Sequence, residues 1–200
     1  MSESLQKYYQ EIRPEAGCDE AGRGCLAGPV MAAAVIIQEG VQIEGLNDSK
    51  QLSKKKREIL RLEIESKCIW AVGSVSAKEI DKINILNASF LAMHRALDQL
   101  KEDLGYILVD GNRFKAYHQI PHTCIVKGDA KFLAIAAASI LAKTHRDEWM
   151  EKCSEEFPEY LWNQNMGYPT KAHRDAIKKH GVTRWHRRSF ALLPVQTSLF

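Results

Sequence analysis

The sequence has few cysteines, and their spacing fits neither a metal site nor a disulfide framework. Five occur among 200 residues, with no CxxC pair and no spacing typical of a zinc site. An odd, scattered set of this kind predicts reduced thiols. The cysteines are Cys18, Cys25, Cys68, Cys124 and Cys153.

Long apolar segments are also absent from the sequence. The longest run, residues 132–142, is followed at once by Lys143 and is far shorter than the roughly 20 residues that span a bilayer. The first 15 residues alternate polar and charged side chains and contain no apolar segment typical of a signal peptide. We therefore expect a cytoplasmic protein.

The net charge of the chain is small. The 28 lysines and arginines exceed the 25 acidic residues by three, so net charge alone does not indicate nucleic-acid binding. With 45% apolar and 26% charged residues, the composition is that of a globular protein. No GxxxxGK[ST] loop is present, which disfavours a nucleotide-dependent phosphotransferase. The length fits one compact domain, or one domain with a small terminal appendage.

Apolar periodicity predicts an alternation of strands and helices. We expect strands over 16–21, 30–37, 69–77 and 106–109 and a brief one at 125–126, and helices over 53–67, 88–100 and 131–149. Glycines at 22, 24 and 28 predict a turn between the first two strands. This order implies a mixed α/β sheet with helices packed on it. We expect a main domain over 1–155, a helical extension over 156–193 and a flexible tail over 194–200.

Four carboxylates stand at chemically unusual positions. Asp19 and Glu20 lie inside an otherwise apolar strand, where an unpaired buried charge is costly and calls for a compensating cation. Asp110 ends an apolar run, and Asp129 precedes the long helix over 131–149. Convergent carboxylates bind Mg²⁺ or Mn²⁺, and paired ions can activate water beside a scissile phosphate. The pattern therefore favours phosphodiester hydrolysis.

Two of these acids, Asp110 and Asp129, also have a simpler explanation, whereas Asp19 is harder to dismiss. Taken alone, Asp110 and Asp129 are more often strand-end or helix-capping residues than metal ligands. Asp19 and Glu20 are neighbours on one strand and point to opposite faces of a regular pleat. We expect Gly22 and Gly24 to permit a bend or bulge that brings the two side chains together.

The segment Asp19 to Gly24, with the sequence DEAGRG, and the following Gly28-Pro29-Val30 resemble the signature of the ribonuclease HII family. Further blocks resemble the family's other motifs in the same order, so that the resemblance spans about residues 16–173. These blocks are NDSKQL at 47–52, VDG at 109–111, KGD at 127–129, AASILAK at 137–143 and GYPT at 167–170.

The resemblance implies a role for each matching residue. Asp19, Glu20, Asp110 and Asp129 match the family's four metal-binding, catalytic acids. Asp147, four residues after Lys143, is a weaker fifth candidate, because such spacing equally fits an ion pair on one helix face. The remaining matches concern substrate: Gly22, Arg23 and Gly24 match a turn that approaches the ribonucleotide's 2′-hydroxyl and phosphate, and Tyr168 matches a tyrosine that recognises the RNA-to-DNA junction.

The family's known properties set the remaining expectations. They imply a ribonuclease H-like fold, with a mixed five-stranded sheet flanked by helices and a helical C-terminal extension that binds substrate. They also imply an endonuclease that uses Mn²⁺ or Mg²⁺ to cut the RNA strand of RNA/DNA hybrids. The family incises 5′ to single ribonucleotides in duplex DNA by two-metal-ion hydrolysis, leaves 5′-phosphate and 3′-hydroxyl ends, and so initiates ribonucleotide removal. Only about 15 residues precede the first strand, which favours this family over the related type III enzymes with their N-terminal domain.

Basic residues gather in two segments. Residues 171–188 hold seven lysines and arginines against one acid, which we interpret as a surface for duplex phosphates rather than only a solvated face. Lys50 matches the family's phosphate-binding block, whereas the charges over 54–57 are expected to face solvent. Lys143 is expected to be a further phosphate contact.

The last five residues, QTSLF, resemble the peptide with which replication and repair proteins bind the bacterial sliding clamp. Gln196 would make polar contacts while Leu199 and Phe200 enter an apolar pocket. The alternative is that the two apolar residues pack on their own domain. We expect a monomer as the default state.

A second class of function is a non-catalytic adaptor that keeps the fold and binds hybrids or the clamp. Four candidate ligands in matching blocks argue against an adaptor. Loss of activity with retention of binding in an Asp19→Asn variant would distinguish an enzyme from a binding module.

Overall fold

The computed structural model describes residues 5–46 and 52–193. Lys50, Gln196, Leu199 and Phe200, for which roles were predicted, lie outside these ranges. The strands are β1 (Glu15–Ala21), β2 (Val30–Ile36), β3 (Ile69–Val75), β4 (Tyr106–Asp110) and β5 (His122–Ile125). The α-helices are α1 (Lys54–Lys67), α2 (Ala77–Leu97), α3 (Leu133–Glu156), α4 (Trp162–Asn165) and α5 (Lys171–His180), and 3-10 turns occur at η1 (Gly128–Ala130) and η2 (Pro158–Tyr160).

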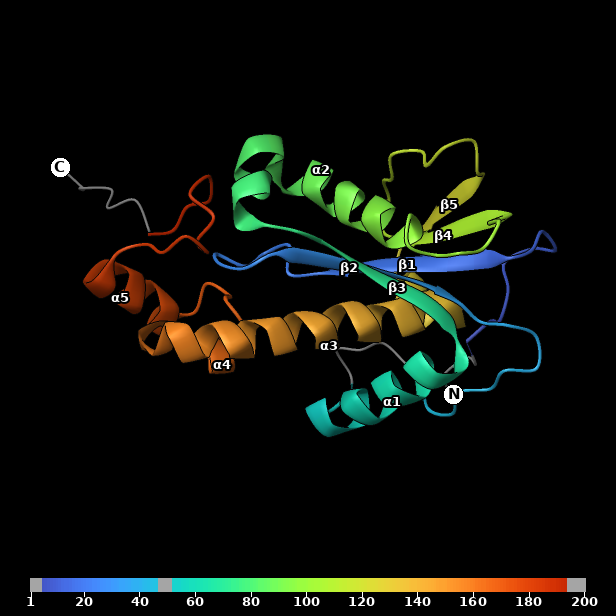
Figure 1. The fold of residues 1–200 in the computed structure, drawn as a ribbon, viewed down its shortest axis with the longest axis horizontal. Coiled ribbons are helices and arrows are strands. Elements are labelled where there is room, and N and C mark those ends of the chain that lie inside the picture. Colours follow the sequence, from blue (N-terminus) through green and yellow to red (C-terminus); the bar gives the residue numbers. More distant parts are fainter. Residues whose placement is uncertain (1–4, 47–51, 194–200) are drawn as a thin grey trace.

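The five strands form one mixed sheet in the order β3-β2-β1-β4-β5 (Figure 1). β2 pairs antiparallel with β1 and β3, whereas β4 pairs parallel with β1 and β5. Because β1 and β4 are parallel, their carboxyl ends lie at the same edge of the sheet. Cys18 is paired with Val109, so the next residue on each strand is an aspartate. The predicted mixed α/β fold is confirmed.

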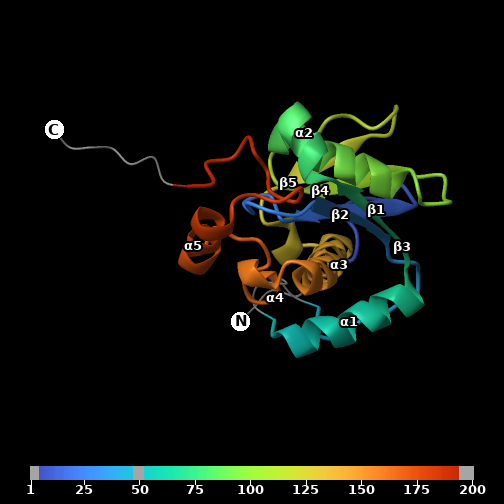
Figure 2. The same cartoon turned by 60° about the vertical axis from the view of Figure 1, so that its left-hand side comes forward.

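Helices cover both faces of the sheet, with α2 on one side and α3 on the other (Figures 1 and 2). All seven residues of β2 are buried, because alternate side chains point into the two layers. Ala32 and Ala34 pack in the core beneath α2, and Ala33 and Val35 pack in the core beneath α3. Small side chains on β2 let both helices lie close to the sheet.

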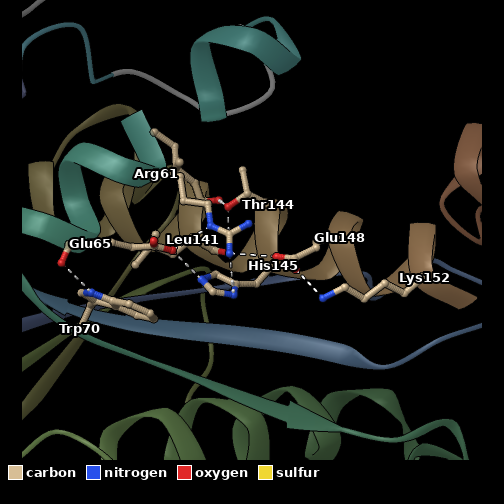
Figure 3. Close-up of polar contacts among 9 residues, drawn as sticks. Arg61, Glu65, Trp70, Leu141, Thr144, His145, Glu148 and Lys152 are labelled. Carbon is tan, nitrogen blue, oxygen red and sulfur yellow. Dashed lines mark hydrogen bonds and ion pairs between the residues drawn. The ribbon is translucent and has the colours of Figure 1, made fainter. Parts of the chain in front are cut away.

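Polar contacts attach α1 to α3 (Figure 3). Arg61 donates to Glu65 over 2.7 Å and pairs with Glu148 on α3 over 2.9 Å. His145 contacts Glu65 over 3.0 Å, and Lys152 pairs with Glu148 over 2.6 Å. This network holds the middle of α1, at Arg61 and Glu65, against α3.

The residues after α3 pack against the loop that follows β1. Leu26 and Met150 share an apolar cluster with Tyr160, Trp162 and Ile177. α3 ends at Glu156, next to the boundary predicted from sequence at 155/156, and short helices follow it (Figure 2). Among the described residues, no helix has the length and apolarity required to cross a membrane.

Several predicted element bounds were wrong. α2 begins at Ala77 rather than at 88, because the Ser76 hydroxyl and the Glu79 carboxylate form a capping box around its first turn. The helix is interrupted at Asn84, whose φ is +64°. The last strand, His122–Ile125, begins three residues before the predicted 125–126 and overlaps it only at Ile125, and α3 continues beyond the predicted end at 149.

Candidate active site

The carboxyl edge of β1 and β4 borders a cavity of about 280 Å³. Asp19 and Glu20 from β1 and Asp110 from β4 contribute carboxylates to its lining. Three cationic side chains, the loop after β1, Ser139 of α3 and an aromatic ring complete the wall. A larger hollow of about 920 Å³ along α2 contains none of the predicted site residues. The structure thus brings three of the four predicted acids to one place.

Asp19 and Glu20 reach the same cavity without a bulge. The antiparallel pairing of β1 with β2 is regular from Ala16 to Ala21, which is paired with Met31, so of the predicted bend or bulge, no bulge occurs within β1. Asp19 accepts hydrogen bonds from the Glu20 amide over 2.6 Å and from the Ser139 hydroxyl. The cavity lies across the end of the strand, which is why both neighbours line it.

The electrostatics of the carboxylates favour a cation. Burial raises the pKa of Asp19 well above its ordinary value, and the charges of Glu20 and Asp110 raise it further. Three oxygen-bearing side chains with mutually unfavourable charge are the ligand type that hard divalent ions prefer. Within residues 5–46 and 52–193 no three acidic, histidine or cysteine side chains form a ready-made metal-binding group. The fit to a metal ion therefore rests on the chemistry of these donors and on their shared cavity.

The structure places Asp129 beside this set rather than in it. Asp129 is buried in η1 and is not part of the cavity lining. The preceding Gly128 amide donates to an Asp110 carboxylate oxygen over 2.7 Å, which ties η1 to the end of β4. Asp147 is buried on α3, where Lys143 donates to it over 2.6 Å. Asp147 therefore forms the ion pair with Lys143 that the sequence offered as the alternative to a metal ligand.

Gly22 and Gly24, in the loop after β1, have different structural requirements. Gly22 has φ +92°, and a Cβ atom there would lie 2.0 Å from Nε of Arg146, so this position requires glycine. A Cβ atom at Gly24 would meet nothing within 4 Å. Arg23, between them, donates to Glu20 over 3.0 Å.

The cations of the cavity wall are Arg23, Arg57 and Lys143. Sequence reasoning assigned Arg57 to a solvent-facing run, and this was wrong because the first turn of α1 directs it toward the site. Lys143, whose predicted phosphate contact remains a prediction, lines the cavity and donates to Asp147. Cations at a carboxylate cavity are suited to holding phosphate oxygens.

Tyr168 lies on the turn between α4 and α5 and lines the cavity. Its hydroxyl hydrogen-bonds the sulfur of the buried Cys25, and burial raises the pKa of both groups. The residue remains 40% exposed, and an accessible aromatic side chain is suited to stacking. The backbone carbonyl of Tyr168 accepts a hydrogen bond from Nδ1 of His173 over 2.9 Å.

The basic segment at 171–188 is only partly a surface. Arg187 is fully buried, so its assignment to the phosphate-binding surface was wrong. Arg174 donates to the carbonyls of Ala191 and Leu192. Lys171 pairs with Asp175 and Arg184 with Glu156. Lys178, Lys179 and Arg188 are exposed.

A buried histidine pair supports the Tyr168 turn. Trp162 donates to Nε2 of His173 over 3.0 Å, and Thr183 donates its amide to Nδ1 of His186 over 2.9 Å. These partners assign both rings as neutral, with Nε2 of His186 donating to Nε2 of His173 over 3.3 Å. Burial lowers the pKa of both histidines, that of His186 to about 4.

This pair predicts that the protein loses stability in mild acid. In the unfolded chain the histidine has a pKa of about 6.5, whereas the buried His186 ring in the folded protein binds a proton only near pH 4. Between these two pH values the unfolded state binds more protons than the folded state, so stability falls as the pH is lowered from about 6.5 to about 4. Thermal unfolding across this range measures the effect. His186→Asn should flatten the slope, whereas His118→Asn, at an exposed position, should retain it. Equal slopes in all three proteins would contradict the assignment.

The sequence did not single out Ser139 or Arg146, and it placed Arg57 and Arg187 on exposed surfaces, although all four residues lie near the site. The available signal was weak, because an arginine within the alanine-rich helix over 131–149 gives no indication of its partners. Arg146 and Arg187 are both buried behind the loop that follows β1.

Comparison with known proteins identifies the family and similar folds. The family model for ribonuclease HII matches residues 16–193. A ribonuclease HII from Parabacteroides distasonis is 62% identical over 196 residues, which are 98% of each chain. The structure of the PCNA:RNase HII complex from Archaeoglobus fulgidus is similar with a TM-score of 0.77 and 26% identity, over 92% of this chain and 98% of that one. Ribonuclease H2 from Pyrococcus horikoshii gives a TM-score of 0.73 and 29% identity, over 89% and 94%. The protein belongs to the ribonuclease HII family, a family of nucleases that are hydrolases.

Proposed function

We propose that this chain is a metal-dependent endonuclease that cuts the RNA strand of RNA/DNA hybrids. We further propose that it incises duplex DNA 5′ to a single embedded ribonucleotide, leaves 5′-phosphate and 3′-hydroxyl ends, and so initiates ribonucleotide removal. The observation that carries the proposal is the cavity in which Asp19, Glu20 and Asp110 face Arg57 and Lys143. Carboxylates and cations on one wall are what a phosphodiester with a metal counter-ion requires.

Asp19, Glu20 and Asp110 would hold a pair of Mg²⁺ or Mn²⁺ ions, with Asp129 as a fourth candidate ligand behind Asp110. Bound ions supply neutralisation of the scissile phosphate and activation of a water molecule. Ser139 orients the Asp19 carboxylate, and the Gly128 amide fixes one oxygen of Asp110. These contacts keep both acids directed at the cavity.

The substrate side of the site consists of the loop Gly22 to Gly24, Tyr168 and the cations. Gly24 leaves open space at the backbone, so the loop can approach a 2′-hydroxyl closely. Tyr168 offers a partly exposed ring for the sugar at the junction. Arg23, Arg57 and Lys143 would hold phosphates on either side of the scissile bond, and Lys50 is proposed as a further contact.

A labelled DNA duplex with one ribonucleotide tests this function. Incision 5′ to the ribonucleotide should require Mg²⁺ or Mn²⁺, disappear with chelator, and be absent from an all-DNA duplex. A long RNA/DNA hybrid is measured in parallel. Binding of both substrates without incision under any metal would favour the adaptor alternative.

We also propose that the tail with Gln196, Leu199 and Phe200 binds a sliding clamp. An archaeal ribonuclease HII that is 26% identical to this chain forms a complex with PCNA, which supports a clamp as partner. A pull-down compares the full chain with a chain lacking the last five residues. Equal capture of both, or of neither, would contradict the proposal.

A further inference from the structure

Two arginines are buried directly behind the candidate active site. Arg146 on α3 is 1% exposed, and Arg187 in the C-terminal segment is fully buried. Burial of a cation is costly unless its donors are satisfied. Here backbone carbonyls accept all the hydrogen bonds that these two side chains are seen to make among the described residues.

Arg146 connects two separate substrate-facing segments. Its Nε donates to the Pro29 carbonyl over 2.9 Å and its Nη2 to the Ala27 carbonyl over 3.1 Å, both in the loop after β1. Its Nη1 donates to the Met166 carbonyl over 2.9 Å, two residues before Tyr168. One rigid guanidinium therefore joins the loop to the Tyr168 turn.

Among the described residues, the side-chain hydrogen bonds of Arg187 go only to carbonyls of the loop after β1. Its donors reach the carbonyls of Arg23 over 2.9 Å, Gly28 over 3.0 Å and Pro29 over 3.1 Å. Burial lowers its pKa to about 10, so the side chain remains charged near neutral pH. Arg187 thus offers a natural comparison for Arg146, with matched chemistry but no bond to the Tyr168 turn.

The packing around Arg146 leaves little freedom between loop and turn. A Cβ atom on Gly22 would lie 2.0 Å from Arg146, and one on Gly167 would lie 2.6 Å from the Ala27 carbonyl oxygen. The Leu26 amide donates to the Gly167 carbonyl over 2.8 Å. The loop and the turn are therefore in direct contact, and Arg146 lies between them.

We propose that Arg146 is a positioning residue that fixes Tyr168 relative to the Gly22 to Gly24 loop, and thereby sets the preference for single embedded ribonucleotides over long hybrids. The inference rests on the proposed function, because it concerns how two substrate-facing segments of that site are held together. A junction is recognised only when the ribose contact and the next-sugar contact are made at once. A long hybrid offers ribose at every position and depends less on that spacing.

Arg146→Lys and Arg187→Lys separate this role from general support. Lysine keeps the charge but lacks the planar fork that reaches three carbonyls. We measure kcat and KM for the single-ribonucleotide duplex and for a long hybrid, below the unfolding midpoint of every variant. Arg95→Lys serves as control, because Arg95 donates to the Ser74 carbonyl and the Glu79 carboxylate but lies on α2, on the opposite face of the sheet.

Arg146→Lys should lower kcat/KM for the single-ribonucleotide duplex about tenfold more than for the hybrid, since small misplacements of recognition groups lower rates strongly. Arg187→Lys should lower both values by a similar factor, and Arg95→Lys should change neither. In a Tyr168→Ala background, which removes the ring, the selective effect of Arg146→Lys should shrink, because coupled residues are not additive. An unchanged substrate ratio in Arg146→Lys, or an equal shift in Arg187→Lys, would overturn the inference.

Hydrogen exchange of the unmodified protein gives a second test that does not depend on variants folding. If Arg146 joins the two segments, the amides of Leu26 and Tyr168 should open with the same free energy. Independent opening of the two amides would refute the coupling. The proposed function fails separately, if the wild-type chain does not incise the single-ribonucleotide duplex at all.

Discussion

Replacing Asp19 by asparagine is expected to lower incision by on the order of 10³-fold, the scale on which loss of one preorganised charge-stabilising group lowers kcat. Asparagine keeps an oxygen for the Glu20 amide, which donates to Asp19 over 2.6 Å, so the local hydrogen bonding survives. The substitution removes a negative charge from the ligand set. Single-turnover cleavage of the single-ribonucleotide duplex at saturating Mg²⁺ measures the loss.

The same substitution should increase the stability of the metal-free protein. Burial and neighbouring acids raise the pKa of Asp19 in the folded protein above its value in the unfolded chain. As the pH rises from the pKa of the unfolded chain through that of the folded protein, this carboxyl group therefore lowers the free energy of unfolding. Asparagine does not ionise, so thermal unfolding at pH 7 with chelator should occur at a higher temperature. Added Mg²⁺ or Mn²⁺ should stabilise the wild type but not the variant.

Asp98→Asn is the matched control for this experiment. Asp98 is exposed at the end of α2, where it accepts a hydrogen bond from Tyr117 over 2.8 Å. Its replacement should leave incision and metal-dependent stabilisation unchanged. Near wild-type incision by the Asp19→Asn protein would remove Asp19 from the proposed ligand set.

Gly17→Ala is expected to lower the free energy of unfolding by about 3 kcal/mol, at the upper end of the range for overpacking a core. A Cβ atom on Gly17 would lie 2.3 Å from the backbone carbon of Ala134 and 2.5 Å from the nitrogen of Ile135. Backbone atoms cannot rotate away as a flexible side chain can, so α3 must shift from β1. Urea unfolding with an unchanged slope measures the difference.

Gly24→Ala is the control for the Gly17 substitution. No atom lies within 4 Å of its added Cβ, and its φ is not in the left-handed region. Stability should therefore be unchanged within about 0.5 kcal/mol. Equal unfolding midpoints for Gly17→Ala and the wild type would show that α3 has room that the structure does not indicate.

Most of the fold was predictable because its signals are local. Apolar alternation located β1 and β2, and Ser53 was recognised as the cap of α1, where it accepts a hydrogen bond from the Lys56 amide. The early start of α2 was also readable, since Ser76 and Glu79 have the spacing of a capping box. The apolar spacing over 88–100 is the stronger helical signal, so the predicted helix began there and left out the first part of α2.

The environment of the site was less predictable because it depends on distant partners. An arginine in a basic segment resembles a surface residue, and the burial of Arg187 follows only from carbonyls in the loop after β1. Arg57 was read as solvent-facing because the attachment of α1 to α3 is not visible in either helix alone. The Asp19 and Glu20 pair needed no bulge, because the cavity extends around the strand end. The roles of Asp129 and Tyr168 came from the family resemblance and remain predictions.

The contact of Arg187 with the loop after β1 also determines when the site can form during synthesis. Arg187 and Arg23 are 164 positions apart, and a ribosome adding about 5–20 residues per second needs roughly 8–30 s to pass from one to the other. The Gly28 amide likewise needs the Trp185 carbonyl. A nascent chain that has already completed its sheet would therefore still lack the support of its substrate loop. The loop after β1 therefore gains these hydrogen bonds only after the segment that contains Trp185 and Arg187 has been synthesised.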